Sequence, residues 1–251
     1  MLLIRFDHVD RLKELQQGSF YMKNSLHYQK TDNADLARSD PFDGSIPFPD
    51  INGVMKTISG RETKNERIIL LNTFIKCFFH CKKNDFQPIG NEMYKFTFSD
   101  EEKRAIYDFN VEGAMLLFSW KSFLEQVENA CCQNCEEVFF GDVIYVDEEG
   151  YNKAIQLLKE NYNERYYIPF YKNIRFCNQK EFRICVHHSF GLNANMSVYD
   201  VRGEKAKEID DLSYSFNIGE IKDSCIVNID KLLNKGILLD KRNDHFYVCD
   251  E

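Results

Sequence analysis

One stretch constrains the fold of this chain more than any other, because residues Ile174–Val186 alternate apolar and polar side chains almost throughout. Successive side chains of a β-strand point to opposite faces, so the pattern predicts a strand with one apolar and one polar face. Asn178 and Lys180 interrupt the apolar face, and we expect a bulge or a sheet margin there. The polar face of this strand would carry, in order, Gln179, Glu181 and Arg183.

These three polar residues have two interpretations. In the first, Glu181 belongs to a ladder of ion pairs with Arg175 and Arg183, which contributes little stability at a surface. In the second, a carboxylate fixed beside the Gln179 amide orients a sugar hydroxyl and stabilises positive charge on an anomeric carbon. A neighbouring arginine would keep that carboxylate ionised. The pattern alone leaves both interpretations open.

Composition limits the class of protein. A chain of 251 residues with 43% hydrophobic content can bury a sizeable core, and we expect one large domain. The net charge of −8 disfavours broad nonspecific binding to nucleic acid or to an anionic membrane. Nine cysteines without a signal peptide indicate a reducing compartment, and no apolar run is long enough to cross a bilayer. We therefore predict a cytoplasmic protein that does not bind membranes.

Strand and helix patterns are mixed along the chain without a regular βαβ rhythm. This mixture predicts an α+β fold with a mixed or antiparallel sheet and flanking helices. Ser99 and Glu102 form a capping-box pattern at a helix start. Strands are expected at Leu2–Phe6, Ser19–Met22, Thr73–Cys81, Met93–Phe98, Gly113–Phe118, Val138–Val146 and Cys225–Ile229, helices at Glu62–Leu71, Gly150–Asn161 and around Phe123 and Leu232, and a hairpin at Ile237–Val248.

Two further features near the N-terminus bear on function. Arg5 lies in an otherwise apolar strand, where it either reaches the sheet edge or is held by an anionic partner. The polar segment Gln29–Arg38 leads to the turn Asp40–Gly44, which contains Asp-Pro and Asp-Gly. Such a segment is either mobile surface or a lid over a ligand.

Cysteine spacing raises the question of zinc. Cys77 and Cys81, with His80 beside them, and the pair Cys132 and Cys135 supply enough ligands for one ion. Buried free thiols are ordinary in an aromatic strand, however, and the second pair lies near an expected helix end. We expect no metal. The sequence also has no glycine-rich phosphate loop and no His-Glu-x-x-His motif.

Several short motifs, taken in order, resemble a bacterial domain family of unknown function. That family has an early Asp-Pro-Phe-Glu turn and a late Glu-x-Glu-x-Arg strand. This chain has Asp-Pro-Phe-Asp, with Asp43 in place of the glutamate, and Gln-Lys-Glu-Phe-Arg, with Gln179 in place of the first glutamate. The likeness extends over most of the chain.

The late strand also resembles the Gln/Glu-x-Glu strand of ADP-ribosyltransferases. This resemblance implies an ADP-ribosyltransferase-like core over residues 1–190, with residues 191–251 closing the same domain. It implies that NAD is a substrate, that Glu181 is catalytic and that Gln179 contacts the acceptor. Residues that bind NAD would be Arg5, Ser25 and Arg38.

The implied protein is an intracellular effector, a toxin or an antiviral defence protein, that modifies a nucleic acid or protein acceptor. Such an effector can have an inhibitory antitoxin partner. The alternative is a non-catalytic module of the same fold that senses a nucleotide or binds a partner. A zinc-stapled nucleic-acid binder is a third class, which the acidic composition disfavours.

Overall fold

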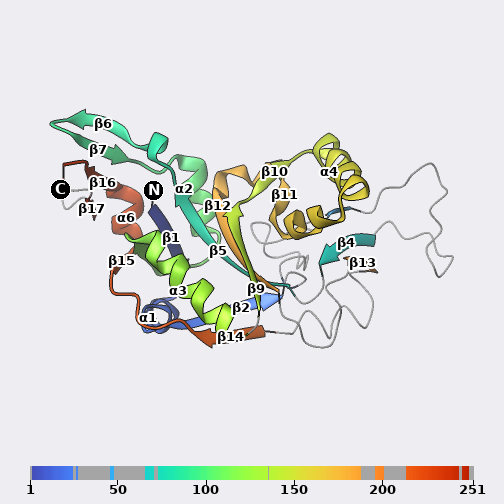
Figure 1. The fold of residues 1–251 in the computed structure, drawn as a ribbon. Helices are drawn as coiled ribbons and strands as arrows, with labels where there is room; N and C mark the ends of the chain where they lie inside the picture. Colours follow the sequence, from blue (N-terminus) through green and yellow to red (C-terminus); the bar gives the residue numbers. More distant parts are fainter. Residues whose placement is uncertain are drawn as a thin grey trace.

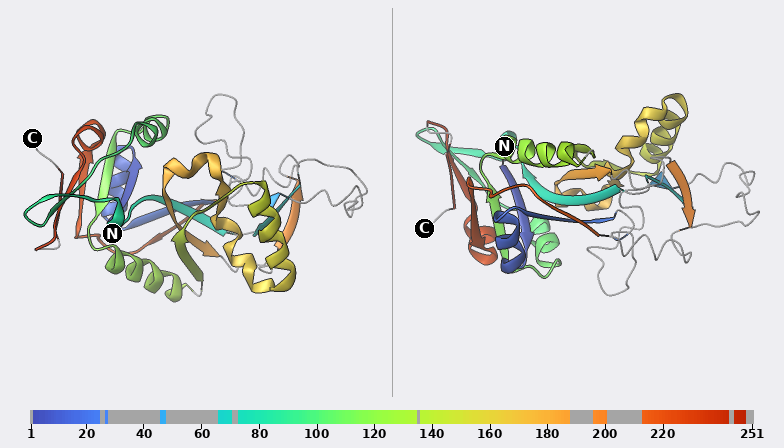
Figure 2. Two further views of the ribbon diagram at one scale, coloured as in Figure 1. Left: turned by 90° about the horizontal axis from the view of Figure 1, so that it is seen from above. Right: turned by 60° about the horizontal axis from the view of Figure 1, so that its bottom comes forward.

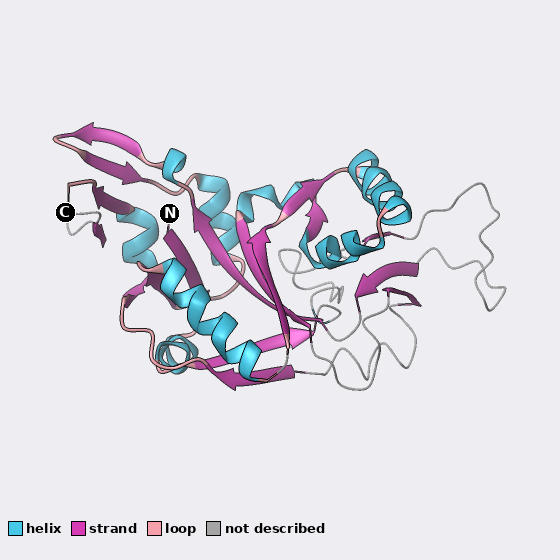
Figure 3. Ribbon diagram, viewed as in Figure 1, coloured by secondary structure: helices cyan, strands magenta, loops and turns pink. Residues whose placement is uncertain are grey.

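The computed structural model describes residues 2–24, 27, 46–47, 66–70, 73–134, 136–187, 196–200, 213–242 and 245–248. Over this part the chain is a mixed α+β protein in which antiparallel sheets are flanked by helices (Figures 1 and 3). The predicted α+β class with a mixed or antiparallel sheet is confirmed.

The main sheet has eight strands and is built around β5, the aromatic strand Thr73–Cys81. Along one edge β5 pairs with β12, and β12 pairs with β9. Along its other edge, the last residues of β5 pair with β1 and the first residues of β5 pair with β2. The remaining strands of this sheet are β1 (Leu2–Asp7), β2 (Ser19–Asn24), β8 (Gly113–Leu117), β9 (Glu137–Asp142), β12 (Glu181–His187), β14 (Ser213–Asn217) and β15 (Ser224–Asn228).

Strands β1 and β2 separate along the edge of β5, and two basic side chains fill the gap between them. Pairing with β1 ends at Ile4, which lies opposite Phe79, whereas β2 pairs only through its last two residues. In the gap, Arg5 donates a 2.7 Å hydrogen bond to the Cys77 carbonyl. Lys76 donates a 2.9 Å bond to the Tyr21 carbonyl. These bonds satisfy backbone acceptors where the strand ladder is open.

Helices cover both faces of the main sheet (Figure 2). Apolar side chains of α1 (Val9–Gln16) and α3 (Trp120–Gln133) pack on one face, in a core that includes Phe20, Phe78 and Phe182. On the other face, α2 (Asp100–Tyr107) and α6 (Ile229–Lys235) pack in a second core. Burial of aromatic side chains in both cores supplies much of the hydrophobic stabilisation.

Three smaller sheets complete the described structure. The hairpin β6–β7 projects from one end of the molecule in Figure 1 and belongs to the four-stranded sheet β17-β16-β7-β6. The bounds of the smaller-sheet strands are β3 (Ile46–Pro47), β4 (Glu66–Leu70), β6 (Gln87–Gly90), β7 (Met93–Phe96), β10 (Ile144–Val146), β11 (Tyr171–Asn173), β13 (Met196–Asp200), β16 (Ile237–Asp240) and β17 (His245–Val248). The other elements are α4 (Glu148–Glu160) and the 3-10 segments η2 (Lys83–Asp85), η3 (Tyr162–Phe170) and η4 (Ile174–Gln179).

Most sequence predictions of local structure are confirmed. The strand Thr73–Cys81 has the predicted bounds, and the hairpin Ile237–Val248 is present as β16 and β17. Ser99 and Glu102 make both hydrogen bonds of the capping box at the start of α2. From the C-terminal segment, β14 pairs with β2 and β15 pairs with β8, so both belong to the main sheet.

Three predictions of local structure are wrong. The expected helix Glu62–Leu71 contains the strand Glu66–Leu70, whose adjacent isoleucines favour extended backbone. The expected strand Val138–Val146 is divided at Val143 into β9 and β10. The stretch Ile174–Val186 is not one strand, because its first half is the 3-10 segment η4.

Candidate functional site: a charged pocket at the end of the main sheet

The start of β12 is set by a sharp change of backbone direction before Glu181. Asn173 precedes η4, and its side-chain oxygen accepts a hydrogen bond from the Arg175 amide, as in an Asx turn. The segment ends at Lys180, which adopts the left-handed conformation with φ of 41°. This conformation is costly for a residue with a Cβ atom and occurs often at functional sites. Glu181 is therefore the first residue of the strand, at the margin of the sheet.

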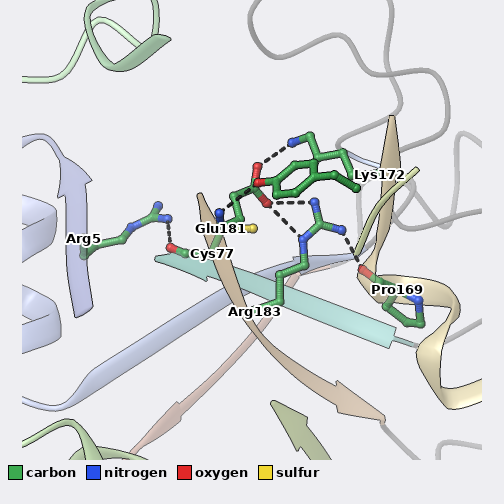
Figure 4. Close-up of polar contacts among 7 residues, drawn as sticks. Arg5, Cys77, Pro169, Lys172, Glu181 and Arg183 are labelled. Carbon is green, nitrogen blue, oxygen red and sulfur yellow. Dashed lines mark hydrogen bonds and ion pairs between the residues drawn. The ribbon is translucent and has the colours of Figure 1, made fainter. Parts of the chain in front are cut away.

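The Glu181 carboxylate lies between two buried cations (Figure 4). Lys172 Nζ is 2.5 Å from Oε1, and Arg183 donates through Nε and Nη2 to Oε2 at 3.0 and 2.8 Å. Burial alone would raise the pKa of Glu181, but the Lys172 ammonium and the Arg183 guanidinium lower it to about 2. Glu181 is therefore ionised at neutral pH, and each of its oxygens is bound to a cation.

The surrounding backbone holds this ion cluster in place. Arg183 is fully buried and donates through Nη1 to the Pro169 carbonyl at 2.6 Å. The Glu181 amide donates to the Tyr145 hydroxyl at 2.9 Å, and the Glu181 carbonyl accepts from the Val143 amide. Through these contacts the Glu181 cluster is bonded to Pro169 and to the segment from Val143 to Tyr145.

A pocket of about 280 Å³ opens at this end of the main sheet. It lies where β5 and β9 end and β12 begins, because neighbouring strands here are antiparallel. The residues that line it are mostly charged or polar: His80, Lys82, Asp85, Asp142, Val143, Tyr145, Cys177, Lys180 and Glu181.

One side of the pocket carries a histidine–aspartate–lysine group. His80 Nδ1 is 2.5 Å from Asp142 Oδ1, and Lys82 Nζ is 2.8 Å from Oδ2. Burial would raise the pKa of Asp142, but hydrogen bonds from His80 and Lys82 lower it on balance. An ionised carboxylate only accepts hydrogen bonds, so His80 donates through Nδ1–H. Its other ring nitrogen, Nε2, is buried and has no partner within the described residues.

Lys180 and Tyr145 also line the pocket. Lys180 Nζ lies 2.9 Å from Glu102 and 3.5 Å from Asp85. Burial would lower the pKa of Lys180, but these two carboxylates raise it. Burial and then the Glu181 charge raise the pKa of Tyr145, so its hydroxyl keeps its proton. That proton has no acceptor among the described residues, although the oxygen accepts from Glu181.

The prediction that Arg5 and Glu181 face one pocket is wrong. Glu181 lies opposite Phe79 across β12 and β5, and Phe79 lies opposite Ile4 across β5 and β1, so these three side chains share a face. Arg5 follows Ile4 and points to the other face, where it contacts Asp7 at 2.7 Å. Figure 4 shows Arg5 directed at the Cys77 backbone, apart from the Glu181 cluster.

Of the other residues predicted by resemblance, only Gln179 is described, and it does not line the pocket with Glu181. Gln179 is buried at the end of η4, so the alternation that would place it beside Glu181 on one strand is absent. Ser25 and Arg38 lie outside the described residues, as do the segment Gln29–Arg38 and the turn Asp40–Gly44.

The cysteine pairs do not form a metal site in the described structure. Cys77 and Cys81 lie four residues apart on β5, a separation of about 13 Å at strand geometry, too far to bind one ion. Cys132 lies on α3, and Cys135 is outside the described residues. No group of three or more candidate ligands occurs among the residues described.

Sequence inspection missed the polar residues around Glu181. Asp142, Tyr145 and Lys172 lie on β9, β10 and β11, and the pairing of β9 with β12 and of β10 with β11 brings these strands together near Glu181. One available signal was Asn173, an Asx-turn residue directly before the apparently regular alternation.

The chain matches no family model, no curated protein and no solved structure. The likeness to the bacterial domain family and to ADP-ribosyltransferases therefore stays a prediction from short motifs. Among the helices described here, none has both the length and the apolar character needed to cross a bilayer.

Proposed function

We propose that the protein is a module that binds a small polar ligand, and that the pocket at the end of β5, β9 and β12 is its binding site. This is the non-catalytic alternative to the NAD-dependent transferase. The observation that carries the proposal is the pairing of the Glu181 carboxylate with two cations. Its two oxygens are already bound to Lys172 and Arg183, so the carboxylate acts as a fixed counter-ion in the pocket wall.

The arrangement of charged residues supports binding more than transfer. A transferase site needs the carboxylate free to face developing positive charge on the sugar. Here Arg5, the expected dinucleotide ligand, lies on the opposite face of the sheet. A pocket of about 280 Å³ is also just below the ~300–1,000 Å³ typical of ligand sites. It suits a mononucleotide or a smaller metabolite better than a whole dinucleotide.

The proposal can be tested with a variant that fills the pocket. Val143 lines the pocket and is buried, so Val143→Trp would place an indole in or beside the ligand volume. Ile89→Trp, on the projecting hairpin, adds the same side chain at an exposed position and serves as the control. Thermal shift and calorimetry with nucleotides and small metabolites should show binding by wild type and by Ile89→Trp, and its loss in Val143→Trp.

Two outcomes would contradict the proposal. Wild-type protein that binds no member of such a panel has no small-ligand site of this kind. Consumption of NAD by wild type, lost in Glu181→Gln while NAD binding persists, would instead establish the transferase. In that case the ion pairs of Glu181 must open during the reaction.

A further inference from the structure

The hydrogen-bonding groups that line the pocket indicate which chemical group of a ligand binds there. Tyr145 is partly buried, its hydroxyl proton has no acceptor within the described structure, and its oxygen is fixed by the Glu181 amide. The hydroxyl proton is therefore available for donation to a ligand. Because burial and then the nearby Glu181 carboxylate raise the pKa of Tyr145, the donor persists through the physiological pH range.

Within the described structure, the three carboxylates that line the pocket already contact basic side chains. Glu181 contacts Lys172 and Arg183, and Asp142 contacts His80 and Lys82, all at 3.0 Å or less, whereas Asp85 lies 3.5 Å from Lys180. A cationic ligand would have to compete with the basic partner of the carboxylate that it approached. An anionic or oxygen-rich ligand can use donors that remain available.

Such donors come from two lysines. An ammonium group carries three protons. In the described structure Lys82 Nζ contacts one carboxylate, Asp142, whereas Lys180 Nζ contacts Glu102 and Asp85. Both side chains line the pocket and remain partly exposed, so the remaining N–H groups can turn toward a ligand. The left-handed backbone of Lys180 places this side chain directly before the start of β12.

We infer that the pocket receives its ligand by an anionic, oxygen-bearing group, a carboxylate or a phosphate, which accepts hydrogen bonds from the Tyr145 hydroxyl and from the ammonium groups of Lys180 and Lys82. This inference rests on the proposed binding function and adds the chemical class of the ligand. Hydrogen bonds between ionised partners are about twice as strong as neutral ones, so the anionic group would dominate the recognition.

Matched probes that differ only in the anionic group test the inference. Adenosine is compared with AMP, and glycerol with glycerol 3-phosphate, by calorimetry at low and at moderate salt, with inorganic phosphate as a competitor. We expect the phosphorylated member of at least one pair to bind at least about tenfold more tightly. Its affinity should fall as salt is raised.

Two variants and two controls locate the effect. Lys180→Met should weaken binding of the phosphorylated probe by about tenfold and leave the neutral probe unchanged. Tyr145→Phe should weaken it several-fold and can also lower stability, because the Glu181 amide loses its acceptor. Lys83→Met and Tyr107→Phe change exposed residues outside the pocket lining and should bind as wild type does.

The outcomes separate this inference from the proposed function. If both members of each pair bind equally, or if Lys180→Met binds as wild type does, the anionic group is not what the pocket recognises. The binding module would then stand without this ligand class. If neither these probes nor the wider panel binds, the proposed function fails as well. If Val143→Trp still binds the phosphorylated probe as wild type does, the anion binds outside this pocket and the inference is overturned.

Discussion

Lys76 is a buried lysine whose charge the fold does not neutralise well, and its replacement gives a quantitative test of the structure. Its Nζ donates to the Tyr21 carbonyl and lies 5.1 Å from the centre of the Phe20 ring. Burial and then repulsion from Arg5 lower the pKa of Lys76 from 10.5 to about 7, although Asp7 acts in the opposite direction. Arg11 on α1 adds further repulsion.

The lowered pKa makes stability depend on pH in a definite direction. Between pH 7 and pH 10.5 the unfolded chain holds a proton on this lysine that the folded chain has lost, so the free energy of unfolding rises with pH. At about 1.4 kcal/mol per pK unit, the contribution from Lys76 should grow by about 2.5 kcal/mol between pH 6 and pH 9. Below pH 7 the full penalty for a buried charge remains.

Lys76→Met removes the titrating group and keeps most of the side-chain volume. Relative to wild type, the free energy of unfolding of Lys76→Met should therefore be about 2–3 kcal/mol higher at pH 6 than at pH 9. Urea denaturation at several pH values measures this difference, and subtraction cancels the other titrating groups. Lys83→Met, at an exposed position, is the control and should show no pH-dependent difference. A difference for Lys76→Met that is the same at pH 6 and pH 9 would refute the lowered pKa.

Three further predictions concern stability. Glu181→Gln should lower the free energy of unfolding by about 3–5 kcal/mol at pH 7, because Lys172 and Arg183 lose a buried counter-ion; denaturant titration measures this, and the exposed Glu101→Gln should change it little. As pH falls from about 4.5 toward 2, the stability that Glu181 contributes should be lost, and Glu181→Gln should show a shallower acid transition than wild type. Gly18→Ala should be strongly destabilising, because Gly18 has φ of +100° and a Cβ would lie 2.6 Å from the Gly219 carbonyl oxygen; Gly90→Ala, which has positive φ but open space, should lose less thermal stability.

The fold was predictable where a local pattern has only one structural solution. Thr73–Cys81 is rich in β-branched and aromatic residues and is buried on both faces, so tertiary packing agrees with its propensity. The capping box at Ser99 and Glu102 is satisfied within one helical turn and needs no tertiary contact. In both cases the structure that the local sequence favours is the one found in the folded protein.

The candidate site was predictable only in part, because its geometry depends on contacts between distant segments. The alternation singled out Glu181 as a candidate site residue, but its partner Lys172 lies on another strand, nine residues earlier. Gln179 was assigned to the same face by alternation. That argument fails because Gln179 lies in the 3-10 segment η4, where side chains do not alternate as they do in a strand. The face of Arg5 follows only from the register of three strands, which no local pattern specifies.

The ion cluster at Glu181 combines the two interpretations that the sequence left open. It is an ion-pair group, but a buried one, so the small energies of surface pairs do not apply. Burying two cations with one carboxylate costs solvation that hydrophobic residues of similar size would not incur. Glu181 lines the polar pocket, and the contacts of its carboxylate with Lys172 and Arg183 hold the start of β12, whose backbone amide donates to Tyr145, in one geometry. Replacing Lys172, Glu181 and Arg183 together by Met, Leu and Leu should therefore preserve or raise stability relative to Glu181→Gln, yet abolish ligand binding. Retention of binding in that triple variant would show that the cluster only supports the fold.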